Sequence, residues 1–341
     1  MSDASSKVAM DRKTFLASAI GLSFTALGAG RASAHAKPPA PIRGKFGAPS
    51  TLRLVLLGTA GGPILNRKRS QPSSLLIAGD RKYLVDLGYG CLQQLVNVGL
   101  APVDIDAAFI THHHLDHNAD LASLISFNWT GGRTRALPIV GPHGTVAMSA
   151  AAIEYFANSE RIFGGEFTHR VPTKAFVMPK DVDQSGQIYS DGAITVSAVE
   201  NSHFQTFAHG NDKSFSLRFQ TRDRSIVFTG DTGFSDAVVE FARGADVLVS
   251  EIIDPEATIQ LASRYARIPA AGQAALIAHM TQEHLPAAQV GQIAARAGVK
   301  TLVLSHFSPS VEPSSVPSLF FRSIRKFYKG PIVAGRDLMV V

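Results

Sequence analysis

Residues 111–118 read T-H-H-H-L-D-H-N, and four of them form the pattern H-x-H-x-D-H. Imidazole nitrogens and carboxylate oxygens are the ligands that suit Zn²⁺ and similar divalent ions. Four such side chains on one short loop indicate two neighbouring metal ions rather than one. The four residues are His112, His114, Asp116 and His117.

The residues before this loop predict how it is positioned. Residues 107–111 (AAFIT) are short, apolar and β-prone, which is typical of a buried strand. In an extended chain, side chains two residues apart point the same way, so His112 and His114 can face one point. Asp116 and His117 then lie in a turn, which can aim them at a second point. The alternative is a polar loop that is rich in histidine by chance.

The loop resembles the metal-binding loop of the metallo-β-lactamase fold superfamily of metallohydrolases. The resemblance covers nearly all of residues 51–341 and is closest to the branch with ribonuclease Z and the metal-dependent arylsulfatases. It rests also on LGTAGG, YLVDLGYG, VGPHGT, FTGDT and AAQVGQIAARAGVKTLVLSHFSP. It implies an α/β (α+β) fold, a four-layer αββα sandwich with the metal loops at one edge. The order of elements, two successive strand-rich halves each followed by helices, agrees with this fold.

The resemblance also implies a set of ligands for two divalent ions, which we expect to be Zn²⁺. His112, His114 and His203 would hold one ion. Asp116, His117 and His306 would hold the other, and Asp231 would bridge the two ions. We prefer His203 to His209 as the third ligand, because His209 lies in a loop of Gly, Asn and Asp residues.

Two further roles follow from the resemblance. Asp86 ends an apolar run before Gly88, where the superfamily has an aspartate that orients the metal loop; helix capping is the alternative. A catalytic histidine is expected before the last long helix, at residues 287–297. His279 stands in the locally similar H-M-T, but the distance to the helix favours His284.

The expected reaction is hydrolysis of a small anionic ester, a phosphodiester or an aryl sulfate, by a metal-bound hydroxide near neutral pH. We expect Asp116 and His284 to act in catalysis. Arg67 and Arg69 are candidates for binding an anionic substrate, with a solvated loop as the alternative. Residues 157–180 lack clear periodicity and are either a cover over the site or an inert surface loop.

Other functions stay open. One is a lactonase or β-lactam hydrolase on the same fold, although E-N-S-H-F replaces the T-P-G-H loop usual in lactonases. Others are an iron enzyme of the superfamily and a non-enzymatic binding protein. A ribonuclease Z-like endonuclease is expected if the chain is not exported. Residues 157–180 lack the Gly- and Lys-rich character of the arm with which ribonuclease Z binds transfer RNA.

The chain has 341 residues, 45% of them hydrophobic and 18% charged, which are values typical of a globular protein. The formal charge of +6 is a mild basic bias that fits an anionic substrate and does not demand nucleic acid. Cys91 is the only cysteine, so no intramolecular disulfide forms.

Residues 1–34 are typical of an export signal. Arg12 and Lys13 precede F-L and an apolar run, and A-S-A at residues 32–34 is a cleavage-site pattern. The order resembles a twin-arginine signal with lysine at its second position. We therefore expect residues 35–50 to be a linker, residues 51–341 to be the hydrolase domain, and the location to be periplasmic or secreted. Export implies no nucleic-acid partner, no stable membrane anchor is expected, and a homodimer is an open alternative.

Overall fold

A computed structural model describes residues 52–341 apart from residues 167–169, 207–209 and 266. The described residues all belong to one compact unit, residues 39–341. The predicted export signal at residues 1–34 and linker at residues 35–50 lie outside the described residues. Among the residues described, no helix has the length and apolar character that crossing a bilayer requires.

Two seven-stranded sheets form the centre of the domain. The strands of the first sheet, in spatial order, are β14 (Met339–Val340), β1 (Leu52–Gly58), β2 (Ser73–Ala78), β3 (Arg81–Val85), β4 (Ala107–Phe109), β5 (Leu137–Pro142) and β6 (Val177–Val182). Those of the second are β13 (Ile332–Ala334), β12 (Thr301–Ser308), β11 (Val247–Ile253), β10 (Ser225–Phe228), β9 (Phe215–Gln220), β8 (Thr195–Glu200) and β7 (Gly186–Ser190).

Each sheet is antiparallel in one half and parallel in the other. Strands β14, β1, β2 and β3 pair antiparallel, whereas β3, β4, β5 and β6 pair parallel. The second sheet repeats this arrangement, with β7 to β10 antiparallel and β10 to β13 parallel. The parallel strands bring their carboxyl ends to one edge of each sheet, which is where α/β folds place ligands.

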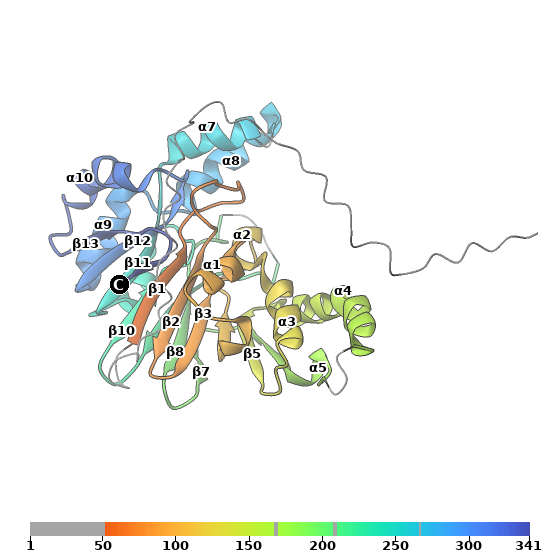
Figure 1. Cartoon of the computed structure of the whole chain (residues 1–341). Coiled ribbons are helices and arrows are strands. Elements are labelled where there is room, and N and C mark those ends of the chain that lie inside the picture. Colours follow the sequence, from red (N-terminus) through yellow and green to blue (C-terminus); the bar gives the residue numbers. More distant parts are fainter. Residues whose placement is uncertain (1–51, 167–169, 207–209, 266) are drawn as a thin grey trace, which may run out of the picture. The chain divides into compact units, whose positions relative to one another are not determined.

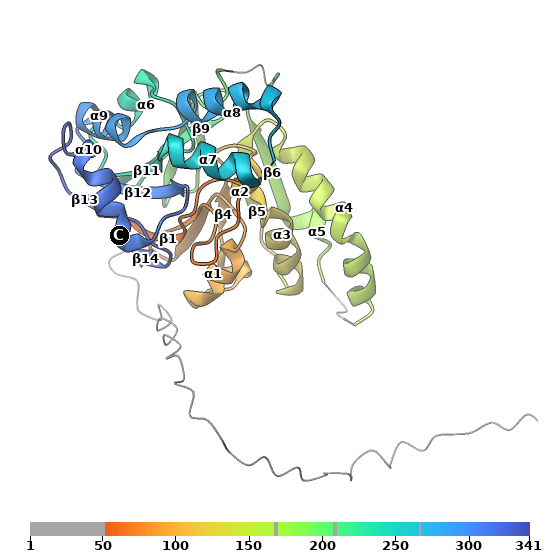
Figure 2. The same ribbon diagram turned by 90° about the horizontal axis from the view of Figure 1, so that it is seen from above.

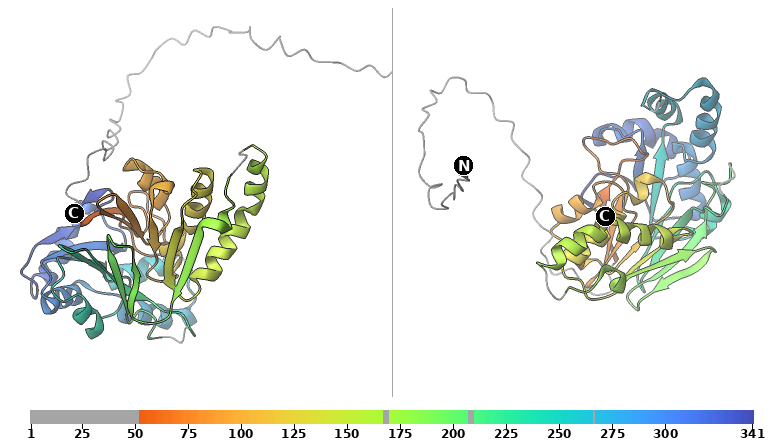
Figure 3. Two further views of the ribbon diagram at one scale, coloured as in Figure 1. Left: turned by 90° about the horizontal axis from the view of Figure 1, so that it is seen from below. Right: turned by 90° about the vertical axis from the view of Figure 1, so that its right-hand side faces the viewer.

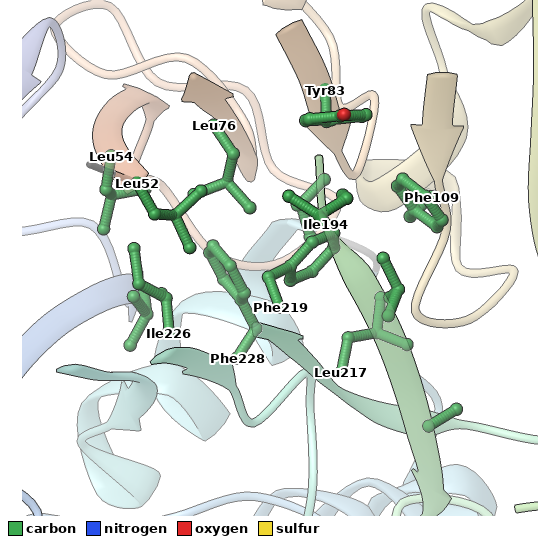
Figure 4. Close-up of a cluster of buried hydrophobic side chains, with 14 of the residues drawn as sticks. Leu52, Leu54, Leu76, Tyr83, Phe109, Ile194, Leu217, Phe219, Ile226 and Phe228 are labelled. Atoms are coloured by element: carbon green, nitrogen blue, oxygen red, sulfur yellow. The ribbon is translucent and has the colours of Figure 1, made fainter. Parts of the chain in front are cut away.

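The main hydrophobic core lies between the two sheets (Figure 4). Phe109 of β4 packs edge-on against Phe219 of β9, with ring centroids 5.2 Å apart. A polar contact also joins the sheets, because the Tyr83 hydroxyl of β3 donates to Asp191 Oδ2 at 2.7 Å. The alternation of inward apolar side chains along β1, β8 and β9 therefore builds a shared interior layer.

Helices cover the outer face of each sheet (Figures 2 and 3). In α9 the buried residues Val290, Ile293, Ala294 and Ala297 recur at helical spacing. This arrangement confirms the predicted αββα sandwich. The first sheet is covered by α1 (Cys91–Asn97), α3 (Leu121–Thr130), α4 (Thr145–Gly164) and α5 (Thr173–Phe176), and the second by α6 (Asp236–Phe241), α9 (Ala287–Ala297) and α10 (Arg322–Ile324). Short helical turns are η1 (Pro102–Asp104), α2 (Leu115–Asn118), η2 (Pro313–Ser315) and η3 (Pro317–Phe321).

Two helices, α7 (Pro255–Tyr265) and α8 (Ala270–Gln282), belong to neither outer layer. They lie together above the sheet edge that carries α2 (Figure 1). They were not predicted from the sequence, where residues 157–180 were interpreted as either a cover over the site or an inert surface loop. The interpretation as a cover is wrong for the described part of the segment, which extends α4 to Gly164 and forms α5 and part of β6, away from the site. The periodicity was hidden because α4 buries only Thr145, Ser149 and Ala152, all in its first half.

Candidate metal centre

Four strand ends bring the predicted metal-binding side chains to one place. The loop after β4 carries His112 and His114, and the turn α2 carries Asp116 and His117. His203 follows β8, Asp231 follows β10, and His306 lies near the end of β12. These seven residues fall into two groups of potential ligands. One group is His112, His114, His203 and Asp231, and the other is Asp116, His117 and His306.

In the first group three imidazole nitrogens converge on one point. His114 Nδ1 lies 3.1 Å from His112 Nε2 and 3.1 Å from His203 Nε2. Burial lowers the pKa of all three histidines, in the case of His114 to about 4. Neutral imidazoles have lone pairs to offer, so this group has the chemistry of a metal site.

Hydrogen bonds on the opposite side of each ring select which nitrogen carries the proton. His203 Nδ1 lies 2.9 Å from the Glu283 carbonyl oxygen, which only accepts, so Nδ1 is the donor and Nε2 has the lone pair. The hydroxyl of Thr111 contacts Asp86 at 3.0 Å and His112 Nδ1 at 3.1 Å. When the hydroxyl donates to the carboxylate it accepts from His112 Nδ1, which again leaves Nε2 free. Such outer contacts are what orient histidine ligands at metal sites.

The residues of the second group are positioned by contacts with carboxylates and by the close approach of the backbone of the Gly-rich turn. His306 Nε2 lies 3.4 Å from Asp116 Oδ2, which also accepts a hydrogen bond of 2.8 Å from the Gly62 amide. A side chain at Gly61 would put its Cβ 2.5 Å from His306 Nδ1, so only glycine allows the loop this close. The Gly-rich turn after β1 therefore positions two candidate ligands.

A β-bulge on β12 directs His306 into the centre. Ser250 pairs with Leu304 and Ile252 with Phe307, so two residues of β12 oppose one of β11. Within the bulge His306 takes a left-handed backbone, with φ of 47°. Non-glycine residues rarely adopt this conformation and concentrate at functional sites when they do.

Asp231 lies between the two groups. Its Oδ1 is 3.4 Å from His117 Nε2, and its Oδ2 is 3.1 Å from His306 Nε2 and 3.8 Å from His112 Nε2. Burial raises the pKa of this carboxyl, but the facing imidazoles of His306 and His117 lower it well below its usual range. Asp231 is therefore an ionised carboxylate that faces histidines of both groups, His117 and His306 of the second and His112 of the first.

The carboxylates near the second group raise the pKa of its histidines. Burial would lower the pKa of His306, but Asp231 and Asp116 raise it to about 10. The same carboxylates raise the pKa of His117 well above its ordinary value despite its burial. His117 Nε2, Asp231 Oδ1 and both ring nitrogens of His306 are buried without a hydrogen-bond partner. Because such atoms are costly to leave unpaired, the residues present fit divalent cations at this place.

Asp86 holds the metal loop from behind the candidate ligands. It follows β3 with a left-handed φ of 58°. One carboxylate oxygen accepts from the Thr111 amide at 2.8 Å, and the other lies 2.9 Å from His117 Nδ1. Since a carboxylate only accepts, His117 donates from Nδ1, and in its neutral form the ring has its lone pair on Nε2, which faces the centre.

The two histidines that competed for a catalytic role both line the cavity beside the centre. Each forms a pair with a buried carboxylate: His284 Nδ1 lies 2.8 Å from Glu251 Oε2, and His279 Nδ1 lies 2.5 Å from Glu283 Oε2. Burial lowers the pKa of His284, but Glu251 outweighs burial and raises it. Burial lowers the pKa of His279. His284 is therefore the more easily protonated of these two histidines.

The two arginines proposed to bind substrate do not line the cavity. Arg69 is buried and its guanidinium donates to Thr59 Oγ1 and to the Gly335 and Val311 carbonyls. It also packs over the Phe307 ring, 4.5 Å from the centroid. The substrate-binding interpretation of Arg69 is therefore wrong, because its guanidinium forms hydrogen bonds inside the fold, to the segments that contain Thr59, Val311 and Gly335. Arg67 is exposed and lies outside the cavity wall.

Sequence reasoning assigned no role to Glu251 or Thr111. Glu251 accepts from the Thr232 amide at 2.6 Å as well as from His284, so it links the segment of Asp231 to the proposed acid. Its sequence signal was a carboxylate directly after the apolar run of residues 247–250. His209, the rejected alternative to His203, lies outside the described residues.

The comparisons with known proteins agree with this geometry. Residues 81–307 match the model of the β-lactamase superfamily domain. Ribonuclease Z of Mycobacterium bovis (strain BCG / Pasteur 1173P2) is 28% identical over 295 residues, which cover 84% of this chain and 96% of that protein. The metallo-β-lactamase fold protein YhfI from Bacillus subtilis superposes with a TM-score of 0.60 and 21% identity over 85% of this chain and 98% of that one. The short form of human tRNase Z gives a TM-score of 0.58 and 20% identity, with 85% of this chain and 98% of that chain covered. The chain belongs to the β-lactamase superfamily and is a hydrolase of the metallo-β-lactamase fold.

Proposed function

We propose that this chain hydrolyses phosphodiesters at a dinuclear metal centre. The observation that carries the proposal is the position of Asp231, whose Oδ2 lies 3.1 Å from His306 Nε2 of one ligand group and 3.8 Å from His112 Nε2 of the other. A carboxylate in that position offsets the repulsion between two close cations. The relatives named Ribonuclease Z favour a phosphodiester over an aryl sulfate as the bond that is cleaved.

The distances between side chains support the ligands that we propose for each ion. His112, His114 and His203 would hold one ion, and Asp116, His117 and His306 the other, with Asp231 shared. Two divalent ions held by these residues would supply positive charge for the phosphate oxygens and would lower the pKa of a bound water. We propose Zn²⁺, because the ligands are mostly imidazoles and the rest carboxylates.

The protein's own residues would manage the proton. Hydrolysis forms a bond from phosphorus to a water oxygen, breaks the bond to the leaving alcohol, and transfers one proton to that alcohol. His284 lines the cavity and is fixed through Nδ1 by Glu251, so its Nε2 can donate this proton. Asp116 accepts a hydrogen bond from the Gly62 amide; burial raises its pKa, but the imidazoles of His117 and His306 lower it overall, so it stays ionised.

A panel of chromogenic esters tests the proposal. Protein of measured metal content should hydrolyse bis(p-nitrophenyl) phosphate in preference to p-nitrophenyl sulfate, a lactone or a β-lactam. A chelator should abolish this activity and Zn²⁺ should restore it. Hydrolysis of the sulfate or the lactone without any cleavage of the phosphodiester would overturn the proposed bond specificity.

We propose separately that the chain is exported, on its sequence alone. The support is Arg12 and Lys13 before an apolar run and the A-S-A pattern at residues 32–34. Fractionation of the native host should find a mature protein that begins near His35 or Lys37 outside the cytosol. Intact protein found only in the cytosol would refute export.

A further inference from the structure

A cavity of about 420 Å³ opens directly above the candidate metal centre. Its floor carries residues already described, including His114, Asp116, Asp231 and His306. A volume in this range is typical of a pocket for a small organic molecule. The size and lining of the cavity therefore determine which organic groups can be attached to an ester that binds at the centre.

The walls above this floor are apolar and come from three segments. The loop after β1 contributes Ile64 and Leu65, α7 contributes Leu261 and Tyr265, and α8 contributes Leu276 and Met280. Pairs spaced four residues apart lie on one face of a helix, so α7 and α8 each turn an apolar face to the cavity.

Helices α7 and α8 contact each other, yet they bury few of their own side chains. Of its described residues α7 buries only Thr258, and α8 buries none. At the cavity rim Leu115 is 64% exposed, Tyr265 64% and Leu65 57%. Large apolar side chains gathered at the mouth of a site mark a surface that a ligand covers.

The charges that line the cavity also favour a small ligand with an apolar group. No lysine or arginine lines it among the described residues, and its only formal charges are the carboxylates and histidines of the floor. A nucleic acid is bound mainly through lysine and arginine contacts to successive phosphates. A chain of phosphates leaving this floor would cross the apolar rim without such partners. A single ester anion would need only the divalent ions that the residues of the floor would hold.

We propose that the substrate is a small phosphodiester monoanion with a bulky apolar organic group, aromatic or branched aliphatic, that binds against α7 and α8. This inference rests on the proposed function, because the metal centre must bind the phosphate. It deepens that function by naming the part of the substrate that the protein's own side chains recognise.

Binding of poorly hydrolysed ligands tests the proposal without relying on turnover. Isothermal titration calorimetry of the metal-loaded protein would compare diphenyl phosphate with dimethyl phosphate, which carry the same charge. Diphenyl phosphate should bind at least about tenfold more tightly, the effect of burying one ring or more. Its binding should also show a negative heat-capacity change, the mark of apolar burial. Equal affinities would overturn the proposal.

Two adjacent residues of α8 provide a variant and a matched control. Leu276 lines the cavity, while the exposed Ile277 does not. Leu276→Gln should weaken diphenyl phosphate about tenfold and leave dimethyl phosphate unchanged. Ile277→Gln should leave both affinities unchanged. Leu261→Gln, at a position already 40% exposed, should repeat the effect and serves if Leu276→Gln fails to fold. Loss of affinity for both ligands alike, in folded variants, would count against recognition by this wall.

Two further measurements, binding of an RNA and hydrolysis of diesters, distinguish this proposal from the proposed function. An oligouridylate of ten nucleotides, in physiological salt, should bind more weakly than diphenyl phosphate, and tighter binding would overturn the proposal. If diesters are hydrolysed but no apolar preference is found, the substrate class is wrong and the proposed function stands. If diphenyl phosphate is preferred but no diester is hydrolysed, the proposed function fails and the apolar recognition stands.

Discussion

Replacing Asp86 with asparagine should weaken metal binding although Asp86 is not itself a candidate ligand. The carboxylate lies 2.9 Å from His117 Nδ1 and accepts from the Thr111 amide at 2.8 Å. In Asp86→Asn the amide oxygen can keep the contact to Thr111. The amide NH₂ then faces His117, whose Nδ1 must accept instead of donate. The proton moves to Nε2, the nitrogen that would bind the metal.

The expected size of the effect follows from the loss of this orienting contact. Removing an outer hydrogen-bond partner of a metal-bound histidine typically lowers metal affinity by about 10- to 100-fold. At 1.4 kcal/mol for each factor of ten, that corresponds to about 1.4–2.8 kcal/mol. The weakening should concern the ion held by His117, Asp116 and His306. The other ion should bind almost as before, because Asp86 contacts His112 only through the Thr111 hydroxyl.

Competition with a chromophoric chelator measures the affinities of both sites in one titration. Asp104→Asn is the matched control, since Asp104 accepts from the Ala101 amide at 2.7 Å in a turn that does not line the cavity. It should bind both ions with wild-type affinity. If Asp86→Asn also binds both ions as tightly as the wild type, the proposed role of Asp86 is wrong.

Particular contacts lead to three other predictions. The His284→Ala variant should still bind both ions, and its rate of hydrolysis should fall by about 100- to 10,000-fold, with a smaller fall for substrates with good leaving groups. If the variant loses metal, or if the rate falls equally for every leaving group, His279 becomes the residue to test as the acid. Burial raises the pKa of the Cys91 thiol, so Ellman's reagent should find no reactive thiol in the native protein and one after unfolding. Burial raises the pKa of Asp191, but hydrogen bonds, foremost from Tyr83, lower it overall, so its stabilising effect is present above pH 4 and is lost as the pH falls through the depressed folded-state pKa. The difference in urea-unfolding free energy between wild type and Asp191→Asn should therefore shrink from pH 6 to pH 3, and a constant difference would contradict the assignment.

The strands and the metal loop were predictable because their signals are local. The apolar runs of β1 and β10 and the turns that follow them can be read directly from the sequence. The loop residues His112 and His114 share a direction because the chain is extended there. The structure brings all seven candidate ligands together, and their binding of metal stays a prediction.

Helix α8 over the site was not predictable from periodicity. Helix α8 buries no residue, so its sequence lacks the apolar stripe that marks a helix packed on a core. Its apolar residues Leu276 and Met280 serve the cavity instead. A segment that binds a ligand rather than the core carries a weaker pattern, which explains why it was missed.

Side chains whose role depends on distant partners were also out of reach. Arg69 was a candidate for substrate binding because it lies in a basic loop with Arg67, yet it donates to the carbonyls of Gly335 and Val311, far along the chain. The pairing of Glu251 with His284 likewise depends on tertiary structure, since 33 positions separate them. Burial of a charge becomes evident only once the fold supplies its partners.

The proposed reaction depends above all on a centre for two metal ions with Asp231 between them. Elemental analysis of protein purified under metal-replete conditions is the decisive test of that centre. We predict two divalent ions per chain in the wild type, and weaker binding of at least one ion in Asp231→Ala, because the remaining cations would repel each other. At most one ion per chain in the wild type, or two tightly bound ions in Asp231→Ala, would contradict a dinuclear centre bridged by Asp231.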